Sequence, residues 1–451
     1  MPLIHDFFLF TLQKLSFLLN LFDLSLKLNG FPIKKAGTVL KSIQNEAEFN
    51  AYFEAKKQDI VQYHLKHNSF YKTFAKGVNY ENWNSIPVMT KQDLQQPLKL
   101  RLSNGFTAKN VYKNKTSGSS GDPFIFAKDK FCHALTWTVI KNRFKTHHIY
   151  FNGSKQARFY GIPLDKKNYY KERFKDFLSN RFRFSVFDLS DAQLKKNVVK
   201  FKTTKFDYIN GYTSAIVQFA KYLKKGNIVL SEICPSLKAC VVTSEMLFDD
   251  DKSLLETQFN IPVINEYGAA ELGVIALQNK NDEWLINNDD LFVEILDDND
   301  NVLPNGEVGR IVITSLYNKA HPFIRYDIGD IGKLTKTSTS TKSVLEKLIG
   351  RTNDIVKLPS GKKATGLSFY YVTKAVIEDD ANVKEFIIEQ LKLDIFKISY
   401  TSKIILSEKK TTQIKQAIET YLETGLTVVF ERKENLLRSN RGKLKQFKSY
   451  L

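Results

Sequence analysis

Five short motifs contain the residues whose types could bind or transform an anionic substrate. The first is the loop Thr116–Gly121, "TSGSSG", which lies between two β-type runs. Glycine lets backbone N–H groups approach a ligand closely, and clustered N–H and hydroxyl groups form a concavity that suits a phosphate. The Walker pattern is absent, because no Lys-Ser or Lys-Thr follows Gly121. By itself, the loop is consistent with a phosphate site and equally with a flexible surface connection.

Four further motifs with charged residues in turns follow the loop along the chain. They are "NEYGAAELG" with Glu271, "FIRYDIGDIGKL" with Asp330, "IGRTNDIVKLPSGKK" with Arg351, and "RSNRGKLKQFKS" with Lys443. Each motif alone is a weak indication, since glycine beside a polar residue is common in turns. Their order over most of the chain is the specific observation.

The elements that position these motifs alternate between helix and strand in the middle of the chain. Residues 45–80 have helical spacing, and Thr90 in "SIPVMTKQDLQQ" is placed to cap a helix that begins at Lys91. The runs "NVYKN" and "FIFA" on either side of the loop predict a hairpin. Between 131 and 260, helical runs such as "AIVQFAKYLKK" alternate with short buried strands such as "KACVVTS", which is typical of an α/β sheet.

The rest of the chain changes character twice. From residue 290 onward the pattern is strand and turn, with "DDND" and "PNG" as turns. After "IGRTNDIVKLPSGKK", strands and helices mix again and predict a small α+β unit. A chain of 451 residues is too long for one ordinary core, so two or three domains are expected.

The ordered motifs resemble those of the adenylate-forming superfamily of acyl-CoA ligases, peptide-synthetase adenylation domains and luciferases. The runs "IPVMTKQDL" and "VVTSEMLFDDDKSLLETQF" look like its phenylacetate–CoA ligase branch and the CapK-like proteins of capsular polysaccharide gene clusters. The resemblance covers residues 85–448. It implies an α/β fold with a large N-terminal domain of several sheets over 1–350, led by a helical segment over 1–85. A small, mobile α+β C-terminal domain would follow over 351–451.

The resemblance also implies a site for ATP and Mg²⁺. The β- and γ-phosphates would be held by Thr116, Ser117, Gly118, Ser119, Ser120 and Gly121. Glu271 would bind Mg²⁺, a hard cation that prefers carboxylate oxygen. The adenine would lie between Tyr267 with Gly268 and Ser244 with Glu245. Asp330 would accept both ribose hydroxyls, and Arg351 would contact ribose or phosphate. Ordinary structural roles, such as turn formation, core packing or a surface position, are the alternatives for these residues.

Two departures from the superfamily pattern bear on this site. Many members carry a lysine shortly after the proline of the loop, but Phe124 follows Pro123 here. The phenylacetate branch lacks that lysine as well, so the compensating positive charge must come from elsewhere. Ala270 replaces the Thr or Ser that usually precedes the glutamate, which removes a hydroxyl that would help to order metal or phosphate. A non-catalytic nucleotide-binding member therefore stays an alternative.

Lys443 is the catalytic residue that the resemblance implies. Its ammonium would bridge the reacting carboxylate and the α-phosphate, and so oppose the repulsion between two anions. Lys445 is its main competitor, and a solvated basic tail is the structural alternative. The C-terminal domain would rotate about Asn353–Asp354 between the two half-reactions, since hinges are short boundary segments.

The implied activity is ATP- and Mg²⁺-dependent activation of a carboxylic acid as an acyl-adenylate, followed by acyl transfer to coenzyme A or another acceptor. Acyl or adenylyl transfer to a sugar, amine or phenolic acceptor in cell-surface polysaccharide biosynthesis is the alternative. The acid is expected to bind between Tyr212–Ser214 and the strand that ends near Tyr267. Aromatic residues in these segments favour an apolar or aryl acid.

The net charge and the cysteine content limit which other classes of protein are consistent with the sequence. The net charge of +19 suits an anionic partner, but the basic residues are dispersed. A basic module that binds nucleic acid or a membrane is therefore the weaker alternative, and no nucleic-acid partner is expected. Cys132, Cys234 and Cys240 have neither zinc nor redox spacing, and His147-His148 forms no metal motif. This sparse cysteine content predicts a cytoplasmic protein.

The N-terminal run "MPLIHDFFLFTLQKLSFLLNLFDLSLKLNGF" is apolar but interrupted. Asp6, Lys14, Asn20, Asp23 and Lys27 break it, so neither a secretory signal nor a membrane span is expected. Its helical spacing predicts an amphipathic helix packed on the body of the protein. A peripheral contact with the inner face of the membrane is the alternative.

Overall fold

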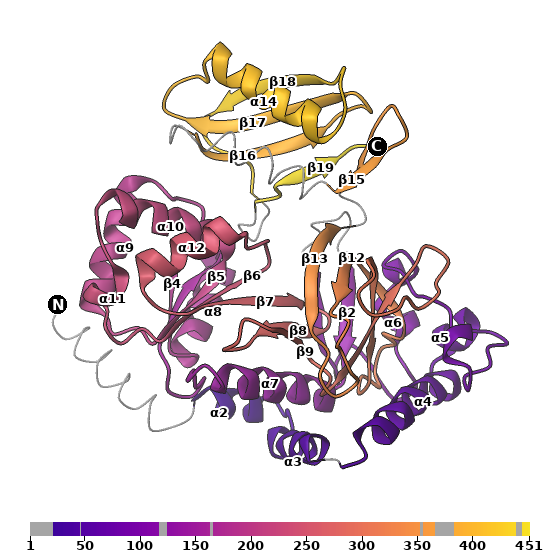
Figure 1. Cartoon of the computed structure of the whole chain (residues 1–451). Helices are drawn as coiled ribbons and strands as arrows, with labels where there is room; N and C mark the ends of the chain where they lie inside the picture. The colour runs from indigo at the N-terminus through magenta and orange to yellow at the C-terminus, as the bar shows by residue number, and fades with distance from the viewer. Residues whose placement is uncertain are drawn as a thin grey trace.

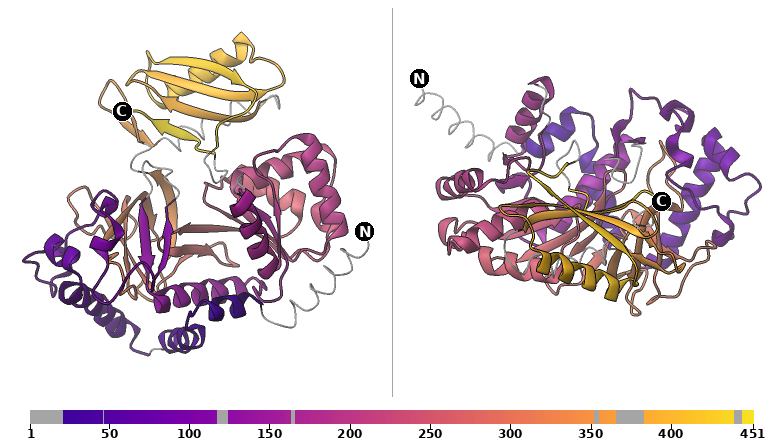
Figure 2. Two further views of the ribbon diagram at one scale, coloured as in Figure 1. Left: turned by 180° about the vertical axis from the view of Figure 1, so that it is seen from behind. Right: turned by 90° about the horizontal axis from the view of Figure 1, so that it is seen from above.

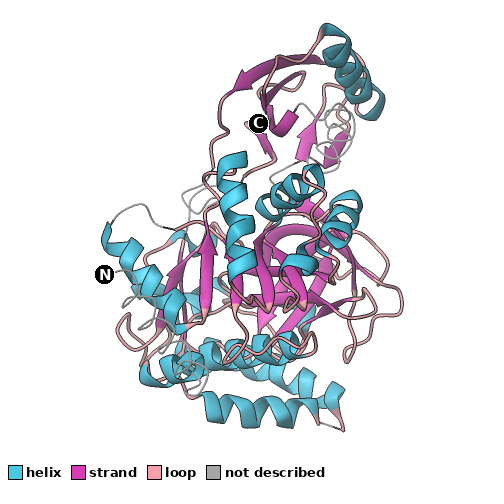
Figure 3. Cartoon of the chain, turned by 90° about the vertical axis from the view of Figure 1, so that its left-hand side faces the viewer, coloured by secondary structure: helices cyan, strands magenta, loops and turns pink. Residues whose placement is uncertain are grey.

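The computed structural model comprises a large body and a smaller C-terminal unit, which lies above the body in Figure 1. The structure describes residues 21–45, 47–116, 124–162, 166–351, 355–365, 383–438 and 444–451. Strands lie inside the large body and helices lie around them (Figure 3).

A seven-stranded sheet forms the centre of the large body. Its strand order is β4-β3-β5-β6-β7-β8-β9, parallel from β4 to β7 and antiparallel from β7 to β9. The strands are β3 (Gln156–Phe159), β4 (Arg181–Phe184), β5 (Tyr208–Tyr212), β6 (Ala239–Thr243), β7 (Val263–Ala269), β8 (Gly273–Gln278) and β9 (Trp284–Ile286). The alternation of helix and strand expected between 131 and 260 is therefore confirmed.

Helices cover both faces of this sheet, as a parallel sheet requires. One face, with Phe159 and Ile209, packs against a group of helices, and the other face, with Tyr208, packs against Phe144 of α7 (Lys130–Lys145). The first group includes α9 (Asp191–Thr203), α10 (Thr213–Lys225), α11 (Leu230–Ile233) and α12 (Asp249–Phe259). Helix α8 (Lys166–Leu178) leads into the edge strand β4. Side chains of opposite pleat therefore enter two separate cores.

A four-stranded antiparallel sheet lies beside the central sheet. Its order is β10-β11-β12-β13, and its strands are β10 (Leu291–Leu296), β11 (Gly309–Ser315), β12 (Tyr326–Leu334) and β13 (Leu345–Arg351). This confirms the strand-and-turn pattern after residue 290. Ile60, Val293 and Ile313 belong to one buried cluster, so this sheet shares its core with the N-terminal helices.

The predicted hairpin on either side of the Gly/Ser loop is present. Strands β1 (Tyr112–Lys115) and β2 (Ile125–Lys128) pair antiparallel, with Lys115 opposite Ile125. The loop residues 117–123 lie outside the described part of the chain.

The first N-terminal helices run along the lower side of the large body, and the later ones lie higher, at one side of it (Figures 1 and 2). They are α2 (Leu21–Leu28), α3 (Ile33–Gln44), α4 (Phe49–His67), α5 (Ser69–Phe74) and α6 (Leu98–Arg101). The helix predicted over 45–80 is thus two helices. Asn68 separates them because its backbone is extended and its side chain accepts a hydrogen bond from the Tyr71 N–H at 2.8 Å.

The prediction of an α-helix that begins at Lys91 is wrong. Thr90 does bond Asp93, whose carboxylate accepts from the Thr90 N–H at 2.7 Å, but the turn that follows is the short 3₁₀ helix η2 (Asp93–Gln95). Pro97 lacks an N–H and restricts the residue before it, so the turn cannot extend into an α-helix. A second 3₁₀ helix, η1 (Trp83–Ser85), precedes it.

The described part of the apolar N-terminal run packs on the body. In α2, the Phe22 ring lies 5.1 Å from Trp137 and 5.4 Å from Phe151, and Asp23 forms an ion pair with Lys141 at 2.5 Å. Residues 1–20 lie outside the described chain, so the alternative of a membrane contact falls there. Among the helices that the structure describes, none combines the length and the apolar character needed to cross a bilayer.

The C-terminal unit is a sheet with one described helix. The sheet order is β18-β17-β16-β19, with β16 (Val383–Gln390), β17 (Ile395–Ser402), β18 (Thr427–Lys433) and β19 (Phe447–Ser449). Helix α14 (Glu408–Tyr421) packs on it through Ile414 and Ile418. A small hairpin, β14 (Ile355–Lys357) with β15 (Lys363–Thr365), connects this unit to the body.

Candidate active site

One pocket of ≈ 450 Å³ brings the sequence-predicted residues together. It lies beside the carboxyl ends of the parallel strands, between α7, the β1–β2 hairpin and β12. Ligands of open α/β sheets bind at this edge. The predicted residues that line it are Thr116, Ser244, Gly268, Glu271 and Asp330.

Glu271 follows β7 in the turn to β8 and is buried. Its Oε1 accepts a hydrogen bond from the Tyr326 hydroxyl at 3.2 Å. Burial raises the pKa of Glu271, while the Tyr326 hydrogen bond and the charge of Lys128 act in the opposite direction. A cation beside this carboxylate would favour its ionised form, so the position fits a metal ligand. Within the described residues, no group of three or more His, Cys, Asp or Glu side chains could hold a metal ion.

Asp330 lies on β12 and faces the same pocket. Its Oδ2 accepts a hydrogen bond from the Tyr267 hydroxyl at 2.7 Å. The Tyr267 ring is buried in the core beside Trp284, with 6.1 Å between the ring centroids. The hydroxyl therefore sets the position of the carboxylate that was predicted to bind ribose.

Thr116 closes the base of the Gly/Ser loop. Its N–H donates to the Phe124 carbonyl at 3.1 Å, and its hydroxyl accepts from the Phe124 N–H at 3.1 Å. These two hydrogen bonds hold the ends of the loop together beside the pocket. The other predicted loop residues lie outside the described chain: Ser117, Gly118, Ser119, Ser120 and Gly121.

Ser244 and Glu245 follow β6 but lie differently. Ser244 lines the pocket with a φ of 71°, a left-handed conformation that is uncommon for serine. Glu245 is not among the lining residues. Its carboxylate accepts hydrogen bonds from the Ser214 N–H at 2.8 Å and the Leu444 N–H at 3.2 Å. Glu245 thus links the large body to the C-terminal segment.

Arg351 and Lys443 are only partly placed. Arg351 pairs with Asp330 between β13 and β12, which brings its backbone next to the predicted ribose site, but its side chain is not described. Lys443 and the predicted hinge Asn353–Asp354 lie outside the described residues. Leu444, which follows Lys443, is buried and contacts Glu245.

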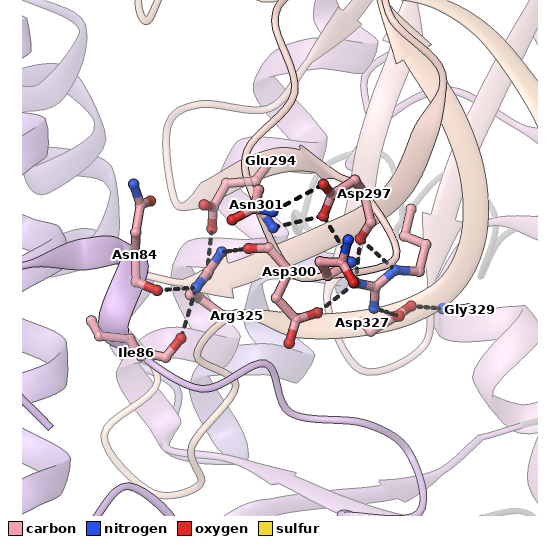
Figure 4. A network of polar contacts seen from close by, with 11 residues as sticks. Asn84, Ile86, Glu294, Asp297, Asp300, Asn301, Arg325, Asp327 and Gly329 are labelled. Carbon is pink, nitrogen blue, oxygen red and sulfur yellow. Dashed lines mark hydrogen bonds and ion pairs between the residues drawn. The ribbon is translucent and has the colours of Figure 1, made fainter. Parts of the chain in front are cut away.

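A polar network holds the start of β12 in place (Figure 4). The buried guanidinium of Arg325 donates to the carbonyls of Ile86 at 2.7 Å and Asp300 at 3.1 Å. Its Nε lies 3.6 Å from Oε2 of Glu294, an ion pair without a hydrogen bond. Arg310 donates to Asp327 on β12 at 2.8 Å. The network therefore supports the strand that carries Tyr326 and Asp330.

Lys128 is a pocket residue that the sequence reasoning missed. It ends β2, only 3% of it is exposed, and its Nζ donates to the Thr136 hydroxyl at 3.1 Å. Gly273, with a φ of 94°, leaves room for this contact, because a Cβ there would lie 2.6 Å from Thr136 Cγ2. The buried ammonium supplies positive charge beside Glu271. A lysine that ends an apolar β run is the signal that could have pointed to it.

The sheet side of the pocket is polar, which the sequence reasoning also missed. Gln156 on β3 donates to Asn210 on β5 at 3.0 Å, and the Thr243 hydroxyl donates to Glu266 on β7 at 2.8 Å. Arg158 lies beside Gln156 along β3 and also lines the pocket. The opposite wall is apolar and aromatic, with Phe22, Trp137, Ile140, Phe144 and Phe151. The predicted apolar or aryl acid would match this apolar wall but not the polar sheet side of the pocket.

Known proteins resemble this chain in sequence and in structure. No protein-family model matches it. Protein CapK of Staphylococcus aureus is 25% identical over 334 residues, which are 70% of this chain and 72% of CapK. A phenylacetate-coenzyme A ligase of Pseudomonas putida is 26% identical over 184 residues, and the match spans 40% of this chain and 41% of that enzyme. A structure of 2-hydroxyisobutyryl-CoA ligase in the postadenylation state matches over 90% of both chains with a TM-score of 0.68 and 16% identity.

The chain has the fold of an adenylate-forming CoA ligase, and its sequence is similar to those of CapK and the phenylacetate-coenzyme A ligases. Its α/β fold, with several sheets and a small C-terminal α+β unit, is the one expected from the motifs. The boundary between residues 350 and 351 stays a prediction. The arrangement of the two parts is closer to one state of the ligase than to another: the TM-score falls from 0.68 to 0.55 when the thioesterification state of the same enzyme is compared.

Proposed function

We propose that this adenylate-forming protein activates a carboxylic acid with ATP and transfers the acyl group to coenzyme A or another acceptor. The observation that carries the proposal is the convergence of Thr116, Glu271 and Asp330 on one pocket. These residues come from three distant segments. The carboxylates of Asp330 and Glu271 accept hydrogen bonds from tyrosine hydroxyls, and the Thr116 hydroxyl accepts one from a backbone N–H. A pocket with the Thr116 end of the Gly/Ser loop at one side and a buried carboxylate at the other suits a nucleoside triphosphate.

The chemistry has two steps. A carboxylate oxygen of the acid attacks the α-phosphorus of ATP, the bond to the β-phosphate oxygen breaks, and pyrophosphate leaves. The acceptor thiol then attacks the acyl carbon, the bond from that carbon to the AMP oxygen breaks, and AMP leaves while the thiol proton passes to solvent. In the first step two anions approach each other, so a lysine ammonium at position 443 would lower the barrier.

The proposed nucleotide contacts follow from the positions of the residues. Asp330, set by Tyr267, would accept ribose hydroxyls, and Arg351 on the adjacent strand would add a contact to ribose or phosphate. Ser244 and Gly268 would lie on two sides of the adenine. The loop closed by Thr116 would donate to the β- and γ-phosphates. Lys128 supports the proposal because it restores a cation near the phosphates.

Glu271 fits a Mg²⁺ ligand by its environment. Its carboxylate is buried at the pocket wall, and Mg²⁺ commonly binds through one or two carboxylates together with substrate phosphates and water. The ion would neutralise charge on the phosphates when bound. Ala270 before it contributes no hydroxyl, so this chain would rely on the Tyr326 hydroxyl to orient the carboxylate.

A second candidate acceptor has its own support. The sequence match to CapK extends over a larger share of the chain than the match to the phenylacetate-coenzyme A ligases. Acyl transfer to a sugar or amine is therefore the alternative second step. Adenylyl transfer to a phenolic acceptor would replace the first step, because the acceptor oxygen would attack the α-phosphorus of ATP and release pyrophosphate. The first step, acid adenylation, is the same for acyl transfer to either acceptor.

The test is ATP–pyrophosphate exchange with a panel of aryl, aliphatic, hydroxy, amino and dicarboxylic acids. We expect exchange with at least one class, and we expect Lys443→Ala to lower its rate by about 10²–10³-fold while Mg-ATP affinity stays within a few-fold. Lys448→Ala, at an exposed position in the same tail, should leave the rate unchanged. Lys445→Ala tests the competing assignment. No exchange with any acid, together with no Mg-ATP binding by calorimetry, would refute the proposed function.

A further inference from the structure

Arg158 is a charged side chain in the pocket that lacks a charged partner. It lies on β3, is half-buried and lines the pocket. Its Nε is fully buried and has no hydrogen-bond partner, and within the described chain the guanidinium forms no ion pair. Its Cζ lies 4.0 Å from the centre of the Tyr160 ring, so the group is held by an aromatic face. A buried guanidinium left in this way costs free energy until an acceptor binds it.

The acidic residues of α8 that face the edge strand β4 are already paired with its arginines. Arg181 donates to Asp176 at 2.5 Å, and Arg183 donates to Asp176 at 2.9 Å and lies 3.1 Å from Glu172. Burial and the charge of Arg181 lower the pKa of Arg158 to about 10, so it stays cationic at neutral pH. The end of the pocket at β3 and β4 is therefore rich in positive charge. Across the sheet, the buried carboxylate of Glu266 feels the charge of Arg158 but accepts its hydrogen bond from Thr243 and forms no ion pair with the guanidinium within the described chain.

The position of Arg158 in the sheet sets the length of a substrate that would contact both Arg158 and the Glu271 end of the pocket. Strands β6 and β5 lie between β7, which leads to Glu271, and β3. With neighbouring strands about 4.8 Å apart, the β7 and β3 backbones are separated by about 14 Å. Gln156 and Asn210 cover part of this distance with amide groups, while Trp137 and Ile140 line the opposite wall. An acid that touches both ends must be elongated, with an apolar middle.

We propose that the acid activated by this protein carries a second anionic group, a carboxylate or a phosphate ester, and that Arg158 binds this remote group. The inference rests on the proposed function, because it takes the reacting carboxylate to lie at the Gly268–Glu271 end of the pocket. A guanidinium matches carboxylate and phosphate with two parallel hydrogen bonds. An apolar or aryl monoacid would leave Arg158 unpaired in a desolvated site. Arg158 is thus the residue that determines specificity.

The first experiment compares acids of matched length by ATP–pyrophosphate exchange. One arm is the series of α,ω-dicarboxylic acids from malonate to suberate, the second is ω-phosphorylated hydroxy acids, and the third is the corresponding monocarboxylic acids. We expect kcat/KM for one dianionic arm to exceed its monoacid counterpart by at least about 10²-fold. Equal or better activity with the monoacids would overturn the inference and leave the proposed function intact.

The second experiment changes the arginine. Arg158→Met should lower kcat/KM for the preferred dianionic acid by about 10²-fold and leave monoacids unchanged or improved. Arg158→Glu should shift the preference toward ω-amino acids such as 6-aminohexanoate. Arg173→Met is the matched control, since Arg173 also lies over an aromatic ring, that of Phe182, but is not among the pocket-lining residues. An unchanged acid preference in Arg158→Met would overturn the inference.

A binding measurement distinguishes failure of the inference about Arg158 from failure of the proposed function. If the wild-type protein exchanges pyrophosphate with no acid, calorimetric titration with the same dicarboxylic and phosphorylated acids decides the inference without catalysis. Binding that Arg158→Met abolishes and Arg173→Met retains would support the anion site even though the proposed function had failed. Absence of binding to the wild-type protein would overturn it.

Discussion

At the scale of residues, two buried carboxylates of the site accept hydrogen bonds from neutral tyrosine hydroxyls. Tyr326 donates to Glu271, and Tyr267 donates to Asp330. A hydrogen bond to an ionised group contributes more than one between neutral groups, because the charge is otherwise desolvated. Each tyrosine therefore fixes the position of one carboxylate, and the Tyr326 hydrogen bond opposes the rise in the pKa of Glu271 that burial causes. Loss of either hydroxyl would therefore cost free energy, because a water molecule would not fully replace its hydrogen bond in this buried site.

Tyr326→Phe tests this arrangement through pH. Burial raises the pKa of Glu271, so its ionised fraction, and with it metal binding, increases as the pH rises through that pKa. Removing the Tyr326 hydroxyl raises the pKa further, and we expect the acid limb of the exchange rate to move to higher pH by about 1 unit. Higher Mg²⁺ concentration should move it back, since metal and proton compete for the carboxylate. The measurement is the pH–rate profile at two Mg²⁺ concentrations.

The matched control for this variant is Tyr71→Phe. The Tyr71 hydroxyl is buried in the same core but has no hydrogen-bond partner. Its removal should leave the pH–rate profile of the wild-type protein unchanged. A shift of equal size in both variants would assign the effect to general changes in the core, and the role given to Tyr326 would be wrong.

At the scale of elements, β12 is the strand on which the site depends most. It carries Tyr326 and Asp330, it pairs with Arg351 on β13, and its first residues are held by Arg325. Arg325 has a φ of 43°, a left-handed backbone that costs of order 1 kcal/mol for such a residue. The hydrogen bonds of its guanidinium to three carbonyls, those of Asn84, Ile86 and Asp300, compensate for this strain.

Arg325→Met should destabilise the protein by about 3–5 kcal/mol, because it leaves Glu294 buried without its partner. Equilibrium unfolding in urea measures the loss. Arg325→Met combined with Glu294→Gln should lose less than the sum of the single variants, since the second change removes the unpaired charge. Arg432→Met, at an exposed arginine that also bonds backbone carbonyls, should cost less than 1 kcal/mol or so. A similarly small loss in Arg325→Met would contradict the role of this network.

At the scale of the whole molecule, the C-terminal unit touches the large body through a small set of residues. Gln218 of α10 donates to the Lys384 carbonyl of β16 at 2.6 Å, Glu245 accepts from Leu444, and Phe248 packs on the core of the C-terminal unit. The structure overlaps better with the postadenylation state of 2-hydroxyisobutyryl-CoA ligase than with its thioesterification state. We therefore expect these contacts to support the proposed adenylation step.

Phe248→Ala should reduce adenylation more than acyl transfer. The change weakens the docking of the C-terminal unit in this arrangement but does not touch the pocket. We expect ATP–pyrophosphate exchange to fall by about 10-fold, which corresponds to about 1.4 kcal/mol of lost packing. Transfer from a supplied acyl-adenylate to coenzyme A should stay near the wild-type rate. Phe187→Ala, at a phenylalanine that is 38% exposed, is the control. Equal losses in both half-reactions would contradict a state-specific contact.

The sequence by itself determined the α/β class, the hairpin around the Gly/Ser loop, the strand-rich region after residue 290 and the resemblance to adenylate-forming enzymes. These features depend on local periodicity, turn chemistry and the order of motifs, which are all present in a linear chain. It also identified five residues that prove to share one pocket: Thr116, Ser244, Gly268, Glu271 and Asp330. Where local signals compete, as at Asn68 and at Pro97 after Thr90, the predicted helices were too long.

Only the tertiary structure decided which other side chains enter the pocket. Lys128, Arg158, Glu266 and Tyr326 lie on four different strands. Lys128 and Arg158 belong to no motif, and Glu266 and Tyr326 lie within two of the motifs without being singled out by them. Their proximity depends on strand order, on register and on which pleat faces the pocket, and a shift of one residue would turn each of them to the opposite face. Contacts between residues distant in sequence bury the side chain of Lys128 and place Arg158 where it forms no ion pair within the described chain. For that reason the polar side of the acid pocket became visible only in the folded chain.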